Sequence, residues 1–505
     1  MTNSVKKSSK LNYTYNLIYQ IFVLITPLIT TPYVSRVLGS DGLGQYAFSI
    51  ALISYFIIFA SMGFSIYSQR EIARYQNDKH KQSVIFWELM IGRSIFVSIA
   101  LIAEVIMIFC GVFGDYTLLM EILSINIFAV FFDILFFYQG NEDFDMIVIR
   151  NIIIKILGIT LIFVFVKNQN DLWIYTLCSS LVLIVSNCSL WFGIHKRLDK
   201  VKNDEIHFKR HLLPMFRLFL PTIAVSIYTI MDKTFIGLIV PGTIVNNLAD
   251  GTTEIVKVAD IENGYYLQSQ KIVTMALTVV TSLGTVMTPR NSHEIATGNI
   301  KGFLSNIYKA LRFVMFIGIP IMFGLIAVSQ NICPWFFGDG YDKVPYLIMI
   351  FSPLILIIGL SNVLGLQYLI PKGKDKRYTI AICIGAGINL IFNSFLIFLF
   401  YSYGAAIASV ISELCVTGVM LYITRKDISI VKLLKSSWKY ILSGLIMFGV
   451  VYFTQTFFAA KIYYSIILIV EGIVVYFGLL YLFKDQFYLD IIAIIRKKLS
   501  RKIKK

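Results

Sequence analysis

Four basic residues could do chemistry in this chain, because each lies within a long apolar stretch. They are Arg93, Arg150, Lys233 and Lys271. Charged side chains in such surroundings are costly to bury and are usually kept for function. A guanidinium binds phosphate oxygens through two parallel hydrogen bonds, and an ammonium binds them as a point charge. The four residues therefore predict a cation-lined cavity that favours an anionic ligand.

Asp232 directly precedes Lys233, and Lys271 lies in the next apolar stretch. If the two stretches are consecutive antiparallel helices, a rise of about 1.5 Å per residue places all three residues roughly 9–12 Å below the same surface. The carboxylate could form an ion pair, with Lys271 or with another base, that locks the two helices together. It could instead carry a proton that is coupled to transport, and the sequence leaves both readings open.

Other kinds of chemistry have no motif in this sequence. It holds no GxxxxGK[ST] phosphate loop and no metal-ligand motif, and its six cysteines show no CxxC spacing. The five histidines lie in or beside predicted loops, where we expect them to be solvated. The loop 241–264 carries four acidic residues that we also expect to be solvated: Asp250, Glu254, Asp260 and Glu262. We therefore expect no enzyme, no cofactor and no metal site.

The apolar stretches are long enough to cross a membrane. Of the 505 residues, 57% are hydrophobic and 15% are charged, and the mean hydropathy is +0.74. Soluble domains hold about 25% charged residues, and a bilayer core needs roughly 20 apolar residues per helix. The sequence predicts an all-α, polytopic membrane protein with fourteen transmembrane helices, at 12–35, 43–67, 83–111, 117–138, 147–166, 172–195, 214–240, 265–288, 307–329, 345–370, 377–400, 404–424, 437–459 and 462–483.

The Lys and Arg residues alternate between the predicted loops. If the N-terminus is cytoplasmic, 31 of the 45 lie on the inner side and 5 on the outer side, and the others lie within the spans. Cytoplasmic loops carry such an excess of Lys and Arg. The distribution predicts that both termini are cytoplasmic and that the number of spans is even, because one missed helix would reverse every later loop.

The spans are expected to form two parallel six-helix bundles around a central cavity, because the first and seventh both run outward. The bundles are predicted at 1–195 and 214–425, with a cytoplasmic linker at 196–213. Residues 426–505 add two further helices and a basic cytoplasmic tail.

Prolines and glycines mark positions that matter within this arrangement. Pro27 and Pro32 remove backbone donors from the first helix, which makes this helix a candidate hinge. Gly44 opens the second span and Gly264 opens the eighth, which gives a weak repeat signal between the two halves.

Several motifs resemble those of Wzx-type flippases for polysaccharide repeat units (O-antigen, capsule or exopolysaccharide). These flippases belong to the multidrug/oligosaccharidyl-lipid/polysaccharide exporter superfamily. Their N-terminal signature is similar to PLITTPYVSRVLGSDGLGQYAFSIALISYFIIFASMGFSIYSQREIAR at 27–74. Their Asp-basic motif resembles YTIMDKTFIG at 228–237, and their eighth helix and following turn resemble GYYLQSQKIV at 264–273 and SLGTVMTPRNS at 282–292. The resemblance extends over the whole chain in topology, although the last third matches mainly by helix count.

The resemblance implies a flippase that moves undecaprenyl-diphosphate-linked oligosaccharide from the inner to the outer leaflet of a bacterial plasma membrane by alternating access. Polysaccharide polymerases and glycosyltransferases would be partners, and nucleic acid would not. Asp232 would orient a basic neighbour or carry a coupling proton. The resemblance implies that the diphosphate contacts Arg93, Arg150, Lys233 and Lys271, with Arg36 and Arg70 at the two mouths of the cavity.

Three alternatives remain at this point. A drug/cation antiporter of the same superfamily would typically have twelve spans and carboxylates in its N-terminal lobe. A teichoic-acid-type flippase would differ only in the sugar. A membrane-embedded glycosyltransferase would need a catalytic set on a large outer loop. Lipid II is disfavoured as the substrate, because the first helix has no arginine between Lys10 and Arg36, where the related lipid II flippases carry arginines.

Overall fold

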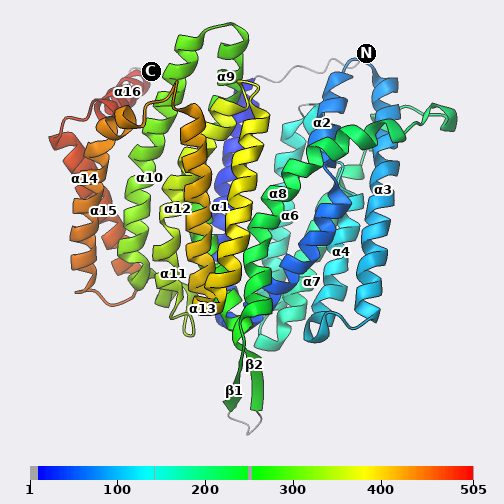
Figure 1. Cartoon of the computed structure of the whole chain (residues 1–505), viewed down its shortest axis with the longest axis horizontal. Helices are drawn as coiled ribbons and strands as arrows, with labels where there is room; N and C mark the ends of the chain where they lie inside the picture. The colour runs from blue at the N-terminus through cyan, green and yellow to red at the C-terminus, as the bar shows by residue number, and fades with distance from the viewer. Residues whose placement is uncertain (1–8, 142, 248–252, 504–505) are drawn as a thin grey trace. The chain divides into compact units, whose positions relative to one another are not determined.

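A computed structural model describes residues 9–141, 143–247 and 253–503. It divides into two compact units, Met1–Gly264 and Tyr265–Lys505, and both are almost entirely helical (Figure 1). Four basic residues in the charge count above, Lys6, Lys7, Lys504 and Lys505, lie outside the described residues, as does Asp250.

The first unit is a helical bundle with one β-hairpin. The hairpin pairs β1 (Thr243–Asn247) with β2 (Thr253–Lys257), with Thr243 opposite Lys257, and it extends past the end of the last complete helix of the unit (Figure 1). The helices are α1 (Ser9–Ser61), α2 (Phe64–Arg74), α3 (Lys79–Phe109), α4 (Thr117–Phe131), α5 (Leu135–Gly140), α6 (Phe144–Phe165), α7 (Leu172–Cys188), α8 (Lys209–Ile239) and the first turns of α9 (Val258–Ala296).

The second unit holds the rest of α9 and the remaining helices. A π-helical segment, Val363–Leu369, directly follows the helix that ends at Asn362. The α-helices are α10 (Ile300–Phe337), α11 (Val344–Phe351), α12 (Pro353–Asn362), α13 (Asp375–Thr424), α14 (Ile430–Gln455), α15 (Ile462–Leu482) and α16 (Gln486–Ile503). Helix α10 packs along α14 and α15, and α13 packs against α11 and α12.

Two of the longest helices are broken inside. Gly39 in α1 has φ 71° and ψ 176°, and Tyr401 in α13 has φ 54° and ψ −130°. Both angles lie outside the helical region, so each helix consists of two segments. The breaks fall between predicted spans, at 36–42 and 401–403, so the apolar runs had located them.

The helices confirm a polytopic membrane protein. Each of the fourteen predicted apolar runs overlaps one or more helices along most of its length. Ten helices in the described part of the chain are long and apolar enough to cross a membrane, with α1 and α13 each counted once. Apolar side chains such as Val474 and Leu482 of α15 are 65% and 72% exposed, as expected for a surface that contacts lipid. The number fourteen stays a prediction.

Candidate functional site

Arg93 is packed inside the first unit. Its side chain is 1% exposed, and its guanidinium lies 4.9 Å from the ring centre of Phe64 and 5.3 Å from that of Phe136. One guanidinium nitrogen, Nη1, donates to the carbonyl oxygen of Asp133, in the break between α4 and α5. Carbonyls at a helix end lack partners within the helix, so an arginine can satisfy them. Arg93 therefore joins α3 to α2 and to the α4–α5 break, and in this conformation its geometry is that of a packing residue.

Arg150 also bonds to neighbouring protein groups. It is half-buried in α6, and its Nη1 donates to the carbonyl oxygen of Ser186 in α7 at 2.8 Å. Its Nη2 donates to the side-chain oxygen of Asn151 at 2.6 Å. These bonds tie α6 to α7, and a phosphate that reached Arg150 would compete with them.

Arg36 and Arg70 lie at exposed positions on the first unit. Arg36 is in α1, three residues before the break at Gly39. Arg70 is in α2, which begins after Gly63, a glycine in the left-handed region with φ 73°. Both side chains are therefore on the surface of the unit, and their placement at the mouths of a cavity stays a prediction.

Asp232 and Lys233 lie in α8, close to the start of α9. The Asp232 side chain is 3% exposed and that of Lys233 is half-buried. The carbonyl oxygen of Lys233 accepts a hydrogen bond from the side chain of Asn263 at 3.1 Å, which joins α8 to α9. Lys271 is half-buried in the part of α9 that belongs to the second unit. The predicted pairing of Asp232 with Lys271 stays a prediction.

The predicted hinge lies in an unbroken stretch of helix. Pro27 and Pro32 are both inside α1, and within Ser9–Ser61 the non-helical backbone angles are at Gly39. The hydroxyl of Thr26 donates to the carbonyl of Phe22 at 2.9 Å, and that of Thr30 donates to the carbonyl of Thr26 at 3.1 Å. Neither of these carbonyls is one that Pro27 or Pro32 leaves without its backbone donor four residues on, and the break in the helix is at Gly39.

The start of α9 contacts the middle of α1 through two glycines. A Cβ atom on Gly44 would lie 1.6 Å from the carbonyl oxygen of Asp260, and one on Gly264 would lie 1.9 Å from that of Ser40. The two contacts mirror each other, because each glycine meets the residue four positions before the other glycine. Only glycine allows such an approach, so the weak repeat signal at Gly44 and Gly264 coincides with a backbone contact.

Acidic residues beside this contact are buried, so the expectation that they are solvated is wrong for Asp260 and Glu262. Their side chains are 3% and 2% exposed. Asp260 accepts a hydrogen bond from the Tyr116 hydroxyl at 2.8 Å, and burial raises its pKa to about 6. Next to it, Lys257 at the end of β2 forms an ion pair with Asp115 at 2.7 Å. The base of the hairpin is thus fastened to the loop before α4.

A second polar cluster in the first unit joins α3 to the predicted linker and α8. The Glu88 side chain is fully buried and accepts hydrogen bonds from the backbone of His207 at 2.6 Å and from Arg210 at 2.5 Å. His211 lies 2.8 Å from Glu88 and 2.7 Å from the hydroxyl of Tyr67. Its side chain is only 5% exposed, so the expectation of a solvated histidine is wrong here.

A cavity of about 600 Å³ adjoins the Glu88 cluster. Its polar lining includes Tyr67, Arg74, His80, Lys81, Glu205 and Arg210. Sequence reasoning missed this cluster because Glu88 and His211 are more than a hundred positions apart. The only sequence signal was an acid within an apolar run.

The second unit holds an apolar groove of about 460 Å³. It is lined by α9, α10, α14 and α15, through residues such as Val279, Pro320, Gly324, Met447, Leu468 and Ile473. Among the described residues that line it, the polar side chain is that of Tyr476, whose hydroxyl donates to the carbonyl of Phe316 at 2.9 Å. The groove therefore suits a hydrocarbon ligand, and sequence reasoning had not predicted it.

The fold and these features define a multi-pass membrane transporter. Residues 9–295 match the sequence profile of the family described as "Polysaccharide biosynthesis protein", and the chain belongs to this family. Residues 256–472 also match the profile of the family described as "Lipid II flippase MurJ". The matched families are those of transporters and flippases, which confirms that the chain is not an enzyme.

Relatives and solved structures agree with this assignment. The chain is 27% identical over 431 residues to the "Putative O-antigen transporter" of Escherichia coli (strain K12), covering 84% of this chain and 99% of that protein. It is 22% identical over 403 residues to the protein of the same name from Shigella dysenteriae, covering 78% and 94%. These matches confirm the predicted resemblance.

Two solved structures show the fold. A lipid II flippase MurJ in an inward closed conformation matches with a TM-score of 0.70 at 18% identity, over 96% of this chain and 100% of that chain. A multidrug resistance MATE family transporter of the MOP superfamily, in an inward-facing conformation, matches with a TM-score of 0.59 at 13% identity, over 82% and 95%. The polytopic, mostly helical fold is thereby confirmed, and the β-hairpin at Thr243–Lys257 is an addition that the sequence did not predict.

Proposed function

We propose that this protein flips undecaprenyl-diphosphate-linked oligosaccharide repeat units from the inner to the outer leaflet of the bacterial plasma membrane, for polysaccharide biosynthesis. Membership of the polysaccharide biosynthesis family supports a role in this process. The relatives named as O-antigen transporters and the match to lipid II flippases support a lipid-linked substrate. Polysaccharide polymerases and glycosyltransferases would then supply or consume this substrate.

The observation that carries the proposal is the apolar groove of the second unit. A polyprenyl chain needs an apolar surface, and α14 and α15, the two helices beyond the predicted bundles, form one side of this groove. Lys271 precedes Val279 of the groove by eight residues on α9, which is about 12 Å of helix. An ammonium and an apolar groove on one helix fit a ligand with an anionic head and a hydrocarbon tail.

Lys233 and the exposed Arg36 and Arg70 are our remaining candidates for the diphosphate. Lys233 is half-buried in α8, and the two arginines are at the surface, where they could meet the head group on entry and exit. Arg93 and Arg150 would contribute indirectly, because their guanidinium groups bond to neighbouring helices. Asp232, which is 3% exposed, would place a carboxylate beside Lys233, either to orient a basic neighbour or to carry a coupling proton.

Alternating access would use the contact between α1 and α9. A contact made by glycine backbones can separate without breaking a large hydrophobic interface, and the break at Gly39 lies next to it. Pro27 and Pro32 would let the first half of α1 bend. Both termini would be cytoplasmic, as the Lys and Arg distribution predicts.

A deletion strain tests the substrate. Without the protein, undecaprenyl-diphosphate oligosaccharide should accumulate on the cytoplasmic leaflet and surface polysaccharide should be lost. Complementation with Lys271→Ala or Lys233→Ala should fail at a normal protein level, whereas Lys376→Ala, which changes an exposed lysine in the first turn of α13, should restore polysaccharide. Normal polysaccharide with both variants would refute the diphosphate assignment.

The groove has its own test. Gly324→Leu places a side chain in the groove, and Gly478→Leu places the same side chain on an exposed face of α15, where a Cβ meets nothing within 4 Å. Only the first should block transport. If the deletion strain instead retains cationic dyes and its lipid-linked sugar is unchanged, the chain is a drug antiporter like the MATE proteins that share its fold.

A further inference from the structure

Helix α16 differs from the other long helices of the second unit in composition and position. Three residues separate it from the end of α15, a candidate membrane span, but it is not itself among the helices apolar enough to cross a membrane. Its sequence is amphipathic, with apolar residues at the three- and four-residue spacing of one helix face: Tyr488, Ile492, Ile495, Leu499 and Ile503. Helix α16 thus starts at the end of a span and has the pattern of an interfacial helix.

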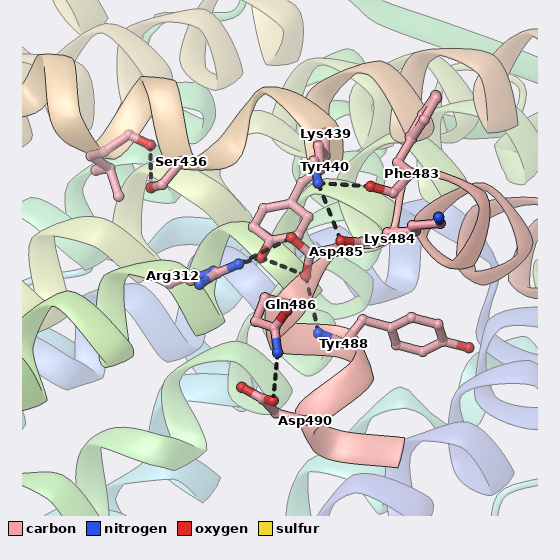
Figure 2. Close-up of polar contacts among 11 residues, drawn as sticks. Arg312, Ser436, Lys439, Tyr440, Phe483, Lys484, Asp485, Gln486, Tyr488 and Asp490 are labelled. Carbon is pink, nitrogen blue, oxygen red and sulfur yellow. Dashed lines mark hydrogen bonds and ion pairs between the residues drawn. The ribbon is translucent and has the colours of Figure 1, made fainter. Parts of the chain in front are cut away.

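The turn before α16 is fixed by side chains of two other helices (Figure 2). The Asp485 side chain is 2% exposed and forms an ion pair with Arg312 of α10 at 3.0 Å. It also accepts hydrogen bonds from the hydroxyl of Tyr440 in α14 at 3.2 Å and from the backbone of Tyr488 at 3.0 Å. The last bond caps the helix N-terminus. Asp485 therefore sets where α16 begins.

A lysine and several rings hold the same junction. Lys439 of α14 donates to the carbonyl oxygen of Phe483 at 2.7 Å, and Lys484 takes the left-handed conformation with φ 48°. The ring of Phe487 lies 5.3 Å from that of Phe316, and the ring of Tyr488 lies 5.4 Å from that of Phe477. The first turn of α16 therefore packs against the unit, so the direction of the helix is set by the protein.

The junction lies at the depth of a membrane interface. Trp438 is 50% exposed beside Phe483, with ring centres 6.0 Å apart, and Tyr481 is 62% exposed. Exposed Trp and Tyr are enriched at the level of the lipid head groups. A helix that leaves this level with an apolar face and a charged face lies along the interface.

The positive charge of the distal half of α16 indicates the kind of partner that this helix contacts. Five of the eight residues at 496–503 are Lys or Arg and none is acidic, and the sequence continues with Lys504 and Lys505. Basic clusters directly after a membrane helix are attracted to anionic lipid head groups. We propose that α16 lies on the membrane surface, held at its start by the Asp485 cluster and along its distal half by anionic phospholipid head groups. The proposal concerns how the chain sits on lipid and does not depend on the transported substrate.

Hydrogen–deuterium exchange on the full-length protein in nanodiscs tests the proposal. One set of discs contains phosphatidylcholine only, and the other contains equal parts of phosphatidylcholine and phosphatidylglycerol. Amides at 490–503 should exchange about tenfold more slowly with phosphatidylglycerol, since each basic residue near an anionic surface contributes substantially. High salt should remove the difference by screening. Amides of α15 should be unaffected.

Matched variants separate the basic cluster from general charge effects. The variant with Arg496→Gln, Lys497→Gln, Lys498→Gln, Arg501→Gln and Lys502→Gln should lose the difference between the two discs. A control with Lys376→Gln and Arg377→Gln, two exposed residues in the first turn of α13, should keep it. Equal exchange of the unaltered protein in both discs would overturn the proposal, as would a lipid-dependent difference that survives in the five-residue variant.

Discussion

Replacing Gly44 or Gly264 by alanine should force α1 and α9 apart. A Cβ essentially never lies within 3.0 Å of a heavy atom outside its own residue and chain neighbours, and a Cβ added at Gly44 would lie 1.6 Å from the Asp260 carbonyl oxygen. The two backbones would have to separate by about 1.4 Å, the difference between 3.0 and 1.6 Å, because a carbonyl cannot rotate out of the way as a side chain can. Overpacking of this kind costs about 1–3 kcal/mol. This cost corresponds to a shift of about 5–150-fold in the equilibrium between the closed and the separated contact.

Amide exchange at 40–44 and 258–264 measures that shift directly. Both variants should exchange faster there by about 5–150-fold, and surface polysaccharide should fall at a constant protein level. Gly449→Ala is the matched control, because a Cβ at this position in α14 meets nothing within 4 Å. Replacing glycine by alanine within a helix should stabilise the folded protein by up to about 1 kcal/mol. If Gly44→Ala behaves like Gly449→Ala, the glycine contact does not limit the approach of the helices, and the reasoning is refuted.

Three further predictions concern buried charges. Glu88→Gln breaks the buried pair with Arg210 and should lower the free energy of unfolding by about 3 kcal/mol, the lower end for such pairs because Arg210 is half exposed. The midpoint of thermal unfolding should therefore be lower for this variant than for Glu121→Gln, which changes an exposed residue. Because burial raises the pKa of Asp260 to about 6, the folded contact favours the protonated acid and weakens as the pH rises through about 6. Exchange at 258–264, corrected for intrinsic rates, should be faster at about pH 7 than at about pH 5, a difference that Asp260→Asn removes. Arg93→Lys loses the planar stacking on Phe64 and Phe136 and should destabilise the first unit, with polysaccharide falling only in proportion to protein level.

The helices could be predicted because each depends on a local property. An apolar run of about 20 residues forms a helix wherever it crosses lipid, so the predicted runs at 83–111 or 462–483 needed no knowledge of neighbours. The breaks at Gly39 and Tyr401 coincide with gaps between runs for the same reason. The family could be predicted because its motifs are contiguous segments.

The site was harder to predict because it depends on which helix faces are neighbours. Arg93 is buried and Arg150 is half-buried, and the sequence did not reveal that they bond a carbonyl at position 133 and another at position 186. His211 and Asp260 were expected in water, yet each meets a tyrosine and lies in the interior of the first unit. A charge in an apolar run indicates that a partner exists, but it does not identify that partner.

The sequence by itself determined the class of protein, the approximate helices and the family. These follow from hydropathy, from the distribution of Lys and Arg, and from contiguous motifs, all of which act over a few residues. Only the tertiary structure decided that Gly44 touches the backbone of Asp260, that Glu88 holds the start of α8, and that α9, α10, α14 and α15 enclose an apolar groove. The reason is that such contacts join residues far apart in the chain, and their geometry is set by helix packing.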